Sequence, residues 1–275
     1  MSLNPGDLLL CAGTLAATPL VDRIAPTAAA GFQGLSVFTT DVASAAAAGV
    51  SLAELRSRIE AAGLAIGEVD PLANWFPSAN HSEGLLAATE DEVFAIAEGL
   101  GARSVTAVVF PVTPPSQDEL IDSFAKLCDR AAEHDLQVHL EFIPFTPVRT
   151  IADATVIVGA VDRPNGGIML DVWHLIRSGG SASEVEAVAE RVLGVQLDDA
   201  PHRSEENLVE ETMHRRLLPG EGDADVAGVI RALREGGSSA PLGVEVFSDV
   251  LAALEPGEAA ELAYRAARAC VEKSG

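Results

Sequence analysis

The sequence is poor in lysine and cysteine, and each shortage excludes a class of protein. Among its 275 residues only Lys126 and Lys273 are lysines, and the formal net charge is −23. A surface so acidic repels phosphate backbones, so we do not expect a nucleic-acid-binding protein. The three cysteines, Cys11, Cys128 and Cys270, are far apart and match no zinc-binding or redox spacing. We therefore expect them to be small buried apolar side chains.

Long apolar runs are also missing. The first residues, MSLNPGDLLLCAGT, lack the basic region and the apolar run that are typical of a secretory signal peptide. No uninterrupted apolar stretch reaches the length of a transmembrane helix. We therefore expect a soluble, cytoplasmic protein that contacts no membrane. The hydrophobic share of 48% is nevertheless sufficient for a large core.

Short apolar runs alternate with amphipathic helical segments along the whole chain. Most of the runs, such as VTAVVF, are continuously apolar, which is typical of parallel strands buried on both faces. They recur roughly every 30 residues, the length of one βα unit. The predicted strands are Leu8–Gly13, Gly34–Phe38, Ala65–Asp70, Ser104–Phe110, Gln137–Phe142, Gly167–Asp171, Gly194–Asp198 and Leu242–Phe247.

Helical periodicity fills the segments between these runs. Leu52, Leu55 and Ile59 share one face after Ser51, which is a favourable N-cap residue. A second apolar face runs from Leu120 to Ala131, and a C-terminal helix is predicted from about Glu258 to Val271. No glycine-rich dinucleotide turn follows the first strand, which disfavours an open Rossmann sheet. We predict that residues 1–275 form one α/β domain, a single (β/α)8 TIM barrel.

Two long irregular segments, Leu72–Thr89 and Ala200–Gly222, follow predicted strands. In a barrel both lie at the C-terminal ends of the strands, where loops usually build the active site. Polar side chains also stand at the ends of four successive strands: Glu141 in HLEF, Asp171 in MLDVWH, Gln196 in VQLDDA and Glu245 in GVEVF. Buried carboxylates gathered at one place repel unless a cation neutralises them, which favours a metal site. Salt bridges to arginines are the alternative.

These motifs resemble the xylose isomerase-like TIM barrels, the sugar phosphate isomerase/epimerase superfamily that includes family-2 AP endonucleases. The resemblance covers essentially the whole barrel and is most specific from Glu141 onward. It implies one divalent metal ion held by Glu141, Asp171, Gln196 and Glu245. A histidine is more usual at the place of Gln196. All four ligands are then oxygen donors, which suits Mg2+ or Mn2+ better than zinc.

The glutamine also points to a narrower group. Gln196 is followed by DAP and by an H-x-R-x-x-PG-x-G run that begins at His214. This part of the chain is similar to bacterial 3-dehydroshikimate dehydratases. No further residue in the N-terminal half is identified that would fix their cyclic substrate.

Three residues are candidates for proton transfer. The resemblance implies that Glu141 and Glu245 face opposite sides of a substrate carbon and exchange its proton, while the metal polarises the neighbouring carbonyl and stabilises an enediolate. In the alternative they are ligands only. His174, three residues after Asp171, is a candidate general base or hydrogen-bond donor, and the alternative is a residue that orients Asp171.

The candidate substrate-binding residues are Asp70, Trp173, Arg203, His214 and Arg216. Arginines bind carboxylates or hydroxyls, although salt bridges between these arginines and nearby glutamates explain them equally well. A core position is the preferred interpretation of His139, and Arg149 is a weaker anion contact.

The leading hypothesis is a metal-dependent isomerase or epimerase of a small polyhydroxy ketone or aldehyde, in a homo-oligomer as is usual for the resembled family. The first alternative is a dehydratase (lyase) of the dehydroshikimate type. The second is a non-catalytic barrel that serves as a scaffold or binding subunit. An AP endonuclease is disfavoured because the chain lacks a basic DNA-binding face and further histidine ligands.

Overall fold

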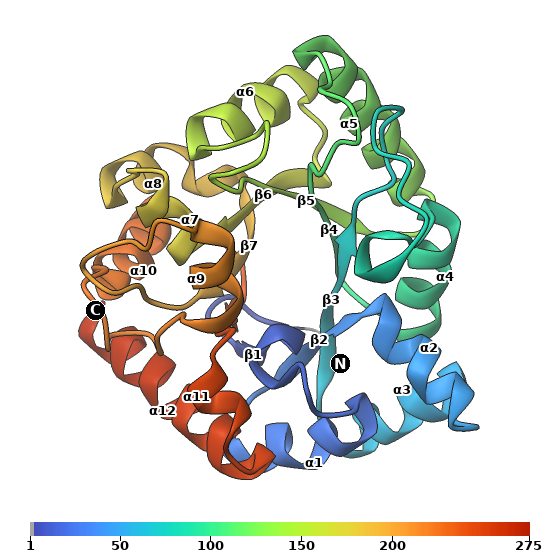
Figure 1. Cartoon of the computed structure of the whole chain (residues 1–275), viewed down its shortest axis with the longest axis vertical. Helices are drawn as coiled ribbons and strands as arrows, with labels where there is room; N and C mark the ends of the chain where they lie inside the picture. Colours follow the sequence, from blue (N-terminus) through green and yellow to red (C-terminus); the bar gives the residue numbers. More distant parts are fainter. Residues whose placement is uncertain (1–2) are drawn as a thin grey trace.

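Eight parallel strands close into a barrel in the computed structural model, which describes residues 3–275. Each strand pairs with the next along the chain, and β8 pairs with β1. Figure 1 looks along the barrel and shows the helices as an outer ring. The predicted (β/α)8 barrel is therefore confirmed. The strands are β1 Leu8–Leu10, β2 Gly34–Phe38, β3 Ala65–Leu72, β4 Ser104–Ala107, β5 Gln137–Glu141, β6 Gly166–Asp171, β7 Val192–Leu197 and β8 Leu242–Val244.

All eight predicted strands are present, but β1, β4 and β8 end three residues earlier than predicted, β5 and β7 end one residue earlier, and β3 ends two residues later. β8 ends early because a side-chain hydroxyl, in place of a carbonyl of the neighbouring strand, accepts a hydrogen bond from the backbone. The Glu245 N–H still donates to the Leu197 carbonyl, whereas the Val246 N–H donates to the Thr14 hydroxyl. That hydroxyl in turn donates to the Val244 carbonyl. Glu245 therefore lies just beyond the strand, at the mouth of the barrel.

Helices follow the strands around the barrel. They are α1 Leu20–Ala30, α2 Thr39–Ala47, α3 Leu52–Ala61, α4 Glu90–Leu100, α5 Gln117–Ala132, α6 Ile151–Val161, α7 Val172–Arg177, α8 Ala182–Val188, α9 Leu208–His214, α10 Val226–Glu235, α11 Asp249–Ala252 and α12 Pro256–Lys273. The predicted N-cap is confirmed, because the Ser51 side chain accepts a hydrogen bond from the Glu54 N–H. None of these helices is long and apolar enough to cross a membrane.

The core lies between the strands and the helices. On β6, the neighbouring residues Ile168, Met169 and Leu170 are all fully buried, as expected for a strand covered on both faces. On α5, the predicted apolar face is confirmed, since Phe124 and Leu127 are fully buried against the barrel. Each such side chain contributes about 1.5–3 kcal/mol of hydrophobic stabilisation.

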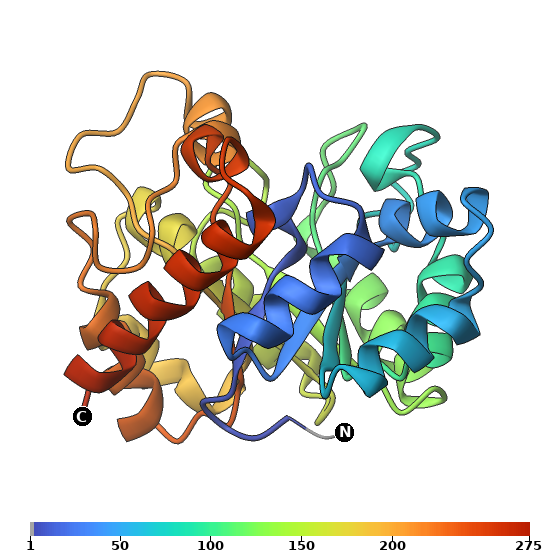
Figure 2. The same cartoon turned by 90° about the horizontal axis from the view of Figure 1, so that it is seen from below.

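The two long loops lie on the same side of the barrel, at the C-terminal ends of β3 and β7 (Figure 2). Asn74 organises the first loop, because its side-chain amide lies within hydrogen-bonding distance of the carbonyls of His81, Leu86 and Ala87. Its Oδ1 accepts from the His81 N–H. The loop is therefore held by specific bonds at the rim of the mouth.

The three cysteines are buried, as predicted, and none forms a disulfide. Burial raises the pKa of the Cys128 thiol to about 12 and raises the pKa values of Cys11 and Cys270 as well. A raised thiol pKa leaves little thiolate at pH 8, and the thiolate is the reactive form. We therefore expect the folded protein to react only slowly with a thiol reagent such as dithionitrobenzoate at pH 8.

The same reagent should titrate all three thiols rapidly in 6 M guanidinium chloride, a condition that serves as the control. Rapid reaction of Cys128 in the folded protein would contradict the packing of α5 against the barrel.

Candidate metal centre

The four predicted ligands all lie at the mouth of the barrel on neighbouring strands. Glu141 and Asp171 are the last residues of β5 and β6, and Glu245 follows β8 directly. Gln196 on β7 is the register partner of Asp171. All four are buried, with at most 6% of any of them exposed. The barrel therefore brings together the polar side chains that the strand ends predicted.

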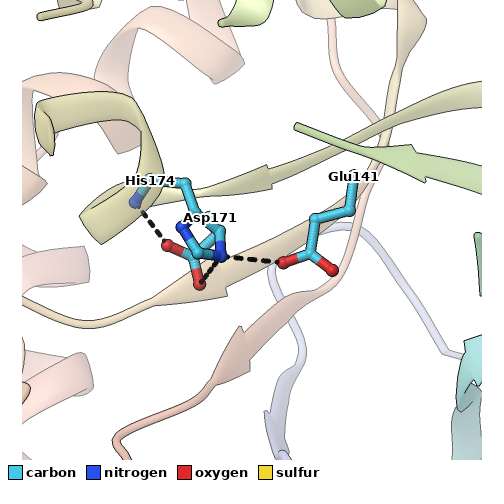
Figure 3. A group of neighbouring side chains, drawn as sticks. All are labelled: Glu141, Asp171 and His174. Carbon is cyan, nitrogen blue, oxygen red and sulfur yellow. Dashed lines mark hydrogen bonds and ion pairs between the residues drawn. The ribbon is translucent and has the colours of Figure 1, made fainter. Parts of the chain in front are cut away.

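Glu141, Asp171 and His174 form the tightest part of this group (Figure 3). One potential ligand atom from each lies within 4.8 Å of the others. The Asp171 carboxylate caps α7, since its Oδ1 accepts from the His174 N–H at 2.7 Å. This cap turns the His174 ring toward β5, where Nε2 lies 3.1 Å from Glu141 Oε1.

Unpartnered polar atoms point to a cation at the same place. Both amide atoms of Gln196, Glu245 Oε1 and His174 Nδ1 are buried and form no hydrogen bond. Leaving such atoms without a partner costs about 1–3 kcal/mol each. A divalent ion coordinated by the Gln196 and Glu245 oxygens would give those two oxygens a partner, and the donor set of three carboxylates and one amide suits a hard cation. The residues therefore fit the metal that the sequence predicted.

Arg216 bridges two of the buried carboxylates. Its Nη1 atom lies 2.6 Å from Asp171 Oδ2 and 2.6 Å from Asp198 Oδ2, and 3.8 Å from Glu245 Oε2. The guanidinium is packed between two rings, with its carbon 5.6 Å from the Trp173 centroid and 5.3 Å from that of Phe247. It is 3% exposed. Arg216 is thus a buried counter-ion of the acidic mouth.

Burial and mutual repulsion raise the pKa values of several carboxyl groups at the mouth. Burial, together with the charges of Glu245, Glu141 and Glu68, raises the pKa of Asp70 well above its usual value. Burial also raises the pKa of Glu245, against the opposing effect of Arg216. The pKa of Asp198 is raised by burial and by the Asp171 charge. Ionisation of these carboxyl groups is therefore unfavourable in free energy, and a nearby cation would make it more favourable.

A polar layer lies deeper in the barrel. Glu68, two residues before Asp70 on β3, accepts a hydrogen bond from the Thr106 hydroxyl. Its Oε2 lies 3.6 Å from His139 Nδ1. Burial lowers the pKa of His139, although Glu68 partly opposes the effect. His139 is 1% exposed, which agrees with its predicted place in the core.

The loop after β7 is closed at its base by Asp199. The Asp199 and Leu217 backbones exchange two hydrogen bonds, and the Asp199 carboxylate accepts from the N–H groups of Gly220, Gly222 and Ala224. Gly222 has no room for a side chain, because an added Cβ would lie 2.3 Å from the Ala200 carbonyl oxygen. The PGEG segment is thus a turn wrapped around one carboxylate.

The other predicted substrate residues lie at different depths. Asp70 is buried on β3, which continues to Leu72, two residues beyond the predicted strand end. Trp173 is fully buried, and its Nε1 donates to Glu211 Oε1. His214 is exposed and pairs with Asp249, and Arg203 is exposed on the loop after β7. Arg149, also exposed, donates to the Pro144 carbonyl.

A family model described as "Xylose isomerase-like TIM barrel" matches residues 24–273. The chain belongs to this family.

Among the curated relatives of this chain, the 3-dehydroshikimate dehydratase of Pseudomonas putida is 25% identical over 84% of the chain. The match covers only 36% of that relative, so the chain spans about a third of its length. The inosose isomerase of Bacillus subtilis is 29% identical over 53% of the chain and 52% of its own length. A solved structure of the IolI protein with a bound zinc atom superposes with a TM-score of 0.84 at 22% identity, covering 98% of this chain and 99% of that one.

Several residues of this barrel's mouth were not singled out by the sequence. Asp198 follows Gln196 by two residues and Glu68 precedes Asp70 by two, so period-two spacing along a strand was the signal available for these two residues. Asp199, the next residue of the VQLDDA run, does not fit this spacing. Glu211 lies on α9 and accepts from both Trp173 and Arg177. Nothing local in the sequence indicates this role, because its partners are about 35 residues away.

We predict that replacing Asp199 destabilises the protein. Asp199→Ala leaves the N–H groups of Gly220, Gly222 and Ala224, which lie in partly buried hydrogen bonds, without their acceptor and should lower the free energy of unfolding by about 3 kcal/mol. Urea denaturation measures this difference. Asp223→Ala, on the same loop but exposed, is the matched control and should change stability by less than about 0.5 kcal/mol. Equal effects of the two substitutions would contradict the anchoring role of Asp199.

Proposed function

We propose that the protein is a divalent-metal-dependent isomerase or epimerase of a small polyhydroxy ketone or aldehyde. The observation that carries the proposal is the convergence of Glu141, Asp171, Gln196 and Glu245 at the barrel mouth, with unpartnered buried atoms on the last two. The relatives of this chain include proteins named as isomerases and dehydratases. These names favour an enzyme over a non-catalytic scaffold. We also propose that residues 1–275 form one domain, and that the protein is cytoplasmic and homo-oligomeric.

We propose that Glu141, Asp171, Gln196 and Glu245 hold one ion. Bound there, Mg2+ or Mn2+ would supply a Lewis acid that polarises the substrate carbonyl. Oxygen donors alone favour these ions over zinc, for which imidazole and thiolate are commoner ligands. The IolI structure, whose protein is 22% identical to this chain, holds a zinc atom and so supports a divalent ion in a barrel of this fold.

Glu141 and Glu245 are proposed to move the carbon-bound proton. They come from β5 and from the end of β8, three strands apart in the closed barrel, so a substrate between them presents one face to each. One carboxylate takes the proton as the C–H electrons form the enediolate of the substrate, and the other carboxyl group returns a proton to carbon. His174, 3.1 Å from Glu141, is proposed to orient Glu141 or to bond to a substrate oxygen.

Asp70, Trp173, Arg203, His214 and Arg216 are proposed to act at the substrate side of the site. Asp70 has the strongest support, because it is buried on β3 and lies close enough to Glu245 and Glu141 for their charges to raise its pKa. Trp173 and Arg216 support the site from beneath, through their contacts with Glu211 and with Asp171. Arg203 and His214 are exposed and would have to reach the mouth through the loop after β7.

A dehydratase of the 3-dehydroshikimate type is the second candidate. It is favoured by the Pseudomonas putida relative, whose match extends over 84% of the chain, against 53% for the inosose isomerase. The two reactions share the enolate, from which a dehydratase expels a β-hydroxyl group. Incubation with 3-dehydroshikimate and Mg2+ separates them, since dehydration yields an aromatic product with ultraviolet absorbance. We expect no such absorbance, and its appearance would favour the dehydratase.

Glu245→Gln should abolish proton exchange. The amide cannot accept the carbon-bound proton, so the incorporation of deuterium from D2O into the substrate should fall by about 100-fold or more. Nuclear magnetic resonance of the substrate measures this exchange. Glu221→Gln, an exposed position on the same side of the barrel, is the control and should exchange normally. Unchanged exchange in Glu245→Gln would contradict the role of this carboxylate.

Gln196→His should change the metal preference. An imidazole in place of the amide oxygen favours zinc, so the ratio of Zn2+ to Mn2+ affinity should rise by about tenfold or more. Calorimetric titration of the metal-free protein measures both affinities. Gln137→His, at the opposite end of β5 from Glu141, is the matched control and should leave the ratio unchanged. An unaltered ratio in Gln196→His would contradict the assignment of Gln196 as a ligand.

A further inference from the structure

A polar layer crosses the interior of the barrel beneath the candidate metal centre. Glu68 on β3 and His139 on β5 face each other, with Oε2 and Nδ1 3.6 Å apart. The His139 ring also covers Gly194 on β7, where an added Cβ would lie 2.4 Å from Nδ1. Neither β3 and β5 nor β5 and β7 are neighbours in the sheet, so these contacts run through the barrel interior. The three residues therefore form one internal layer.

The composition of this layer is unusual for a barrel core. Interior layers of such barrels are mostly filled by branched apolar side chains, whereas here a carboxyl group and an imidazole take their place. Glu68 is 4% exposed and His139 is 1% exposed. The Glu68 carboxyl group accepts from the Thr106 hydroxyl, but neither ring nitrogen of His139 forms a hydrogen bond with any residue from 3 to 275. Burying polar groups with so few partners is unfavourable, which favours a task beyond packing.

The next layer toward the mouth comes from the same three strands. Alternate residues of a strand face the same side, so its members each lie two residues further along: Asp70, Glu141 and Gln196. Gln196 thus stands one step above Gly194, the glycine that leaves room for the His139 ring. Both amide atoms of Gln196 are buried and form no hydrogen bond within the described chain. An unpartnered imidazole therefore lies beneath an unpartnered amide.

The two groups complement each other chemically. A glutamine that binds a cation presents its amide oxygen, so its NH2 group faces away from the ion and needs an acceptor. A neutral imidazole has one donor and one acceptor nitrogen, and a partner at one nitrogen fixes the role of the other. The Glu68 carboxylate, beside Nδ1, favours a proton on that atom. Nε2 of His139 is then left with a lone pair that can accept from an amide.

We propose that His139 is a positioning residue of the metal centre. Its ring, oriented by Glu68, accepts a hydrogen bond from the Gln196 amide, directly or through one water molecule, and so keeps the amide oxygen turned toward the ion. This inference rests on the proposed function, because it requires Gln196 to be a ligand. It extends that function by giving a task to two buried residues that lie one layer below the ligands.

Calorimetric titration of the metal-free protein with Mn2+ tests the proposal. His139→Leu removes the acceptor but fills the space with an apolar side chain, so the affinity for Mn2+ should fall by about tenfold or more. His139→Gln supplies an amide that can donate to Glu68 and accept from Gln196, so it should retain the affinity to within about threefold. Equal losses in the two variants would overturn the proposal, as would no loss in His139→Leu.

A surface pair with the same chemistry supplies matched controls. His134 Nδ1 lies 3.6 Å from Glu98 Oε2, the same separation as in the buried pair, but the Glu98 side chain is 68% exposed. Glu68→Gln should lower the affinity for Mn2+ by at least about threefold, because an amide bonds to either tautomer of His139 and no longer selects one. His134→Leu and Glu98→Gln should leave it unchanged. An unchanged affinity in Glu68→Gln would overturn the part assigned to Glu68.

A double-mutant cycle separates positioning from packing. In a Gln196→Ala background no amide remains to be oriented, so adding His139→Leu should change the affinity for Mn2+ by less than about twofold. A full tenfold fall in this background would mean that His139 acts through the fold, and it would overturn the proposal. Circular dichroism of each variant verifies that it is folded.

Nitrogen-15 nuclear magnetic resonance tests the same point without any substitution. In the Mg2+-loaded wild-type protein the His139 ring should be neutral and carry its proton on Nδ1. Nuclear Overhauser contacts with Gly194, which the ring covers, assign its resonances. A proton on Nε2 instead would leave no acceptor for the Gln196 amide and would overturn the proposal.

Gln196→Ala by itself separates this inference from the proposed function. An unchanged affinity for Mn2+ in that variant would remove Gln196 from the ligands and overturn the proposed metal centre together with the inference, as would a wild-type protein that binds no Mn2+. A loss of affinity in Gln196→Ala without a loss in His139→Leu would retain the metal centre and overturn the inference alone.

Discussion

The bridge from Asp171 through Arg216 to Asp198 is the interaction on which the rest of the mouth depends. The Arg216 guanidinium lies 2.6 Å from a carboxylate oxygen of each aspartate, and all three side chains are buried. Loss of the guanidinium would therefore leave two buried carboxylates that repel each other. The bridge joins the ends of β6 and β7 to the loop that carries Arg216. The same carboxylate of Asp171 caps α7, and so the position of His174 follows from it. The proposed metal ligands, the loop after β7 and the candidate base His174 thereby depend on the same ion pairs.

The loop after β7 is a structural part of the site. Asp199 holds its returning end by backbone N–H groups, and Glu211 ties α9 to Trp173 and Arg177 on α7. Buried carboxylates are costly, yet each of these accepts several hydrogen bonds, which offsets the loss of hydration. The barrel thus uses acidic residues in two ways. Some are fully bonded and fix the backbone, while others, such as Glu245, retain a free oxygen at the mouth.

The fold was predictable because every strand carries its own signal. Continuous apolar runs at βα spacing identified all eight strands, and the ends of four of them placed Glu141, Asp171, Gln196 and Glu245 at one edge. What the sequence did not predict depends on partners remote along the chain. The early end of β8 results from the Thr14 hydroxyl, some 230 residues away in sequence. The engagement of Arg216 by two aspartates likewise depends on closure of the barrel.

The central claim is that these four side chains hold one divalent ion, and crystals grown with Mn2+ test it most directly. Anomalous scattering from manganese should give one strong peak bounded by oxygens of Glu141, Asp171, Gln196 and Glu245, at about 2.0–2.3 Å from each ligand. Absence of a peak there at saturating Mn2+ would contradict the account. The mouth would then be a salt-bridged scaffold.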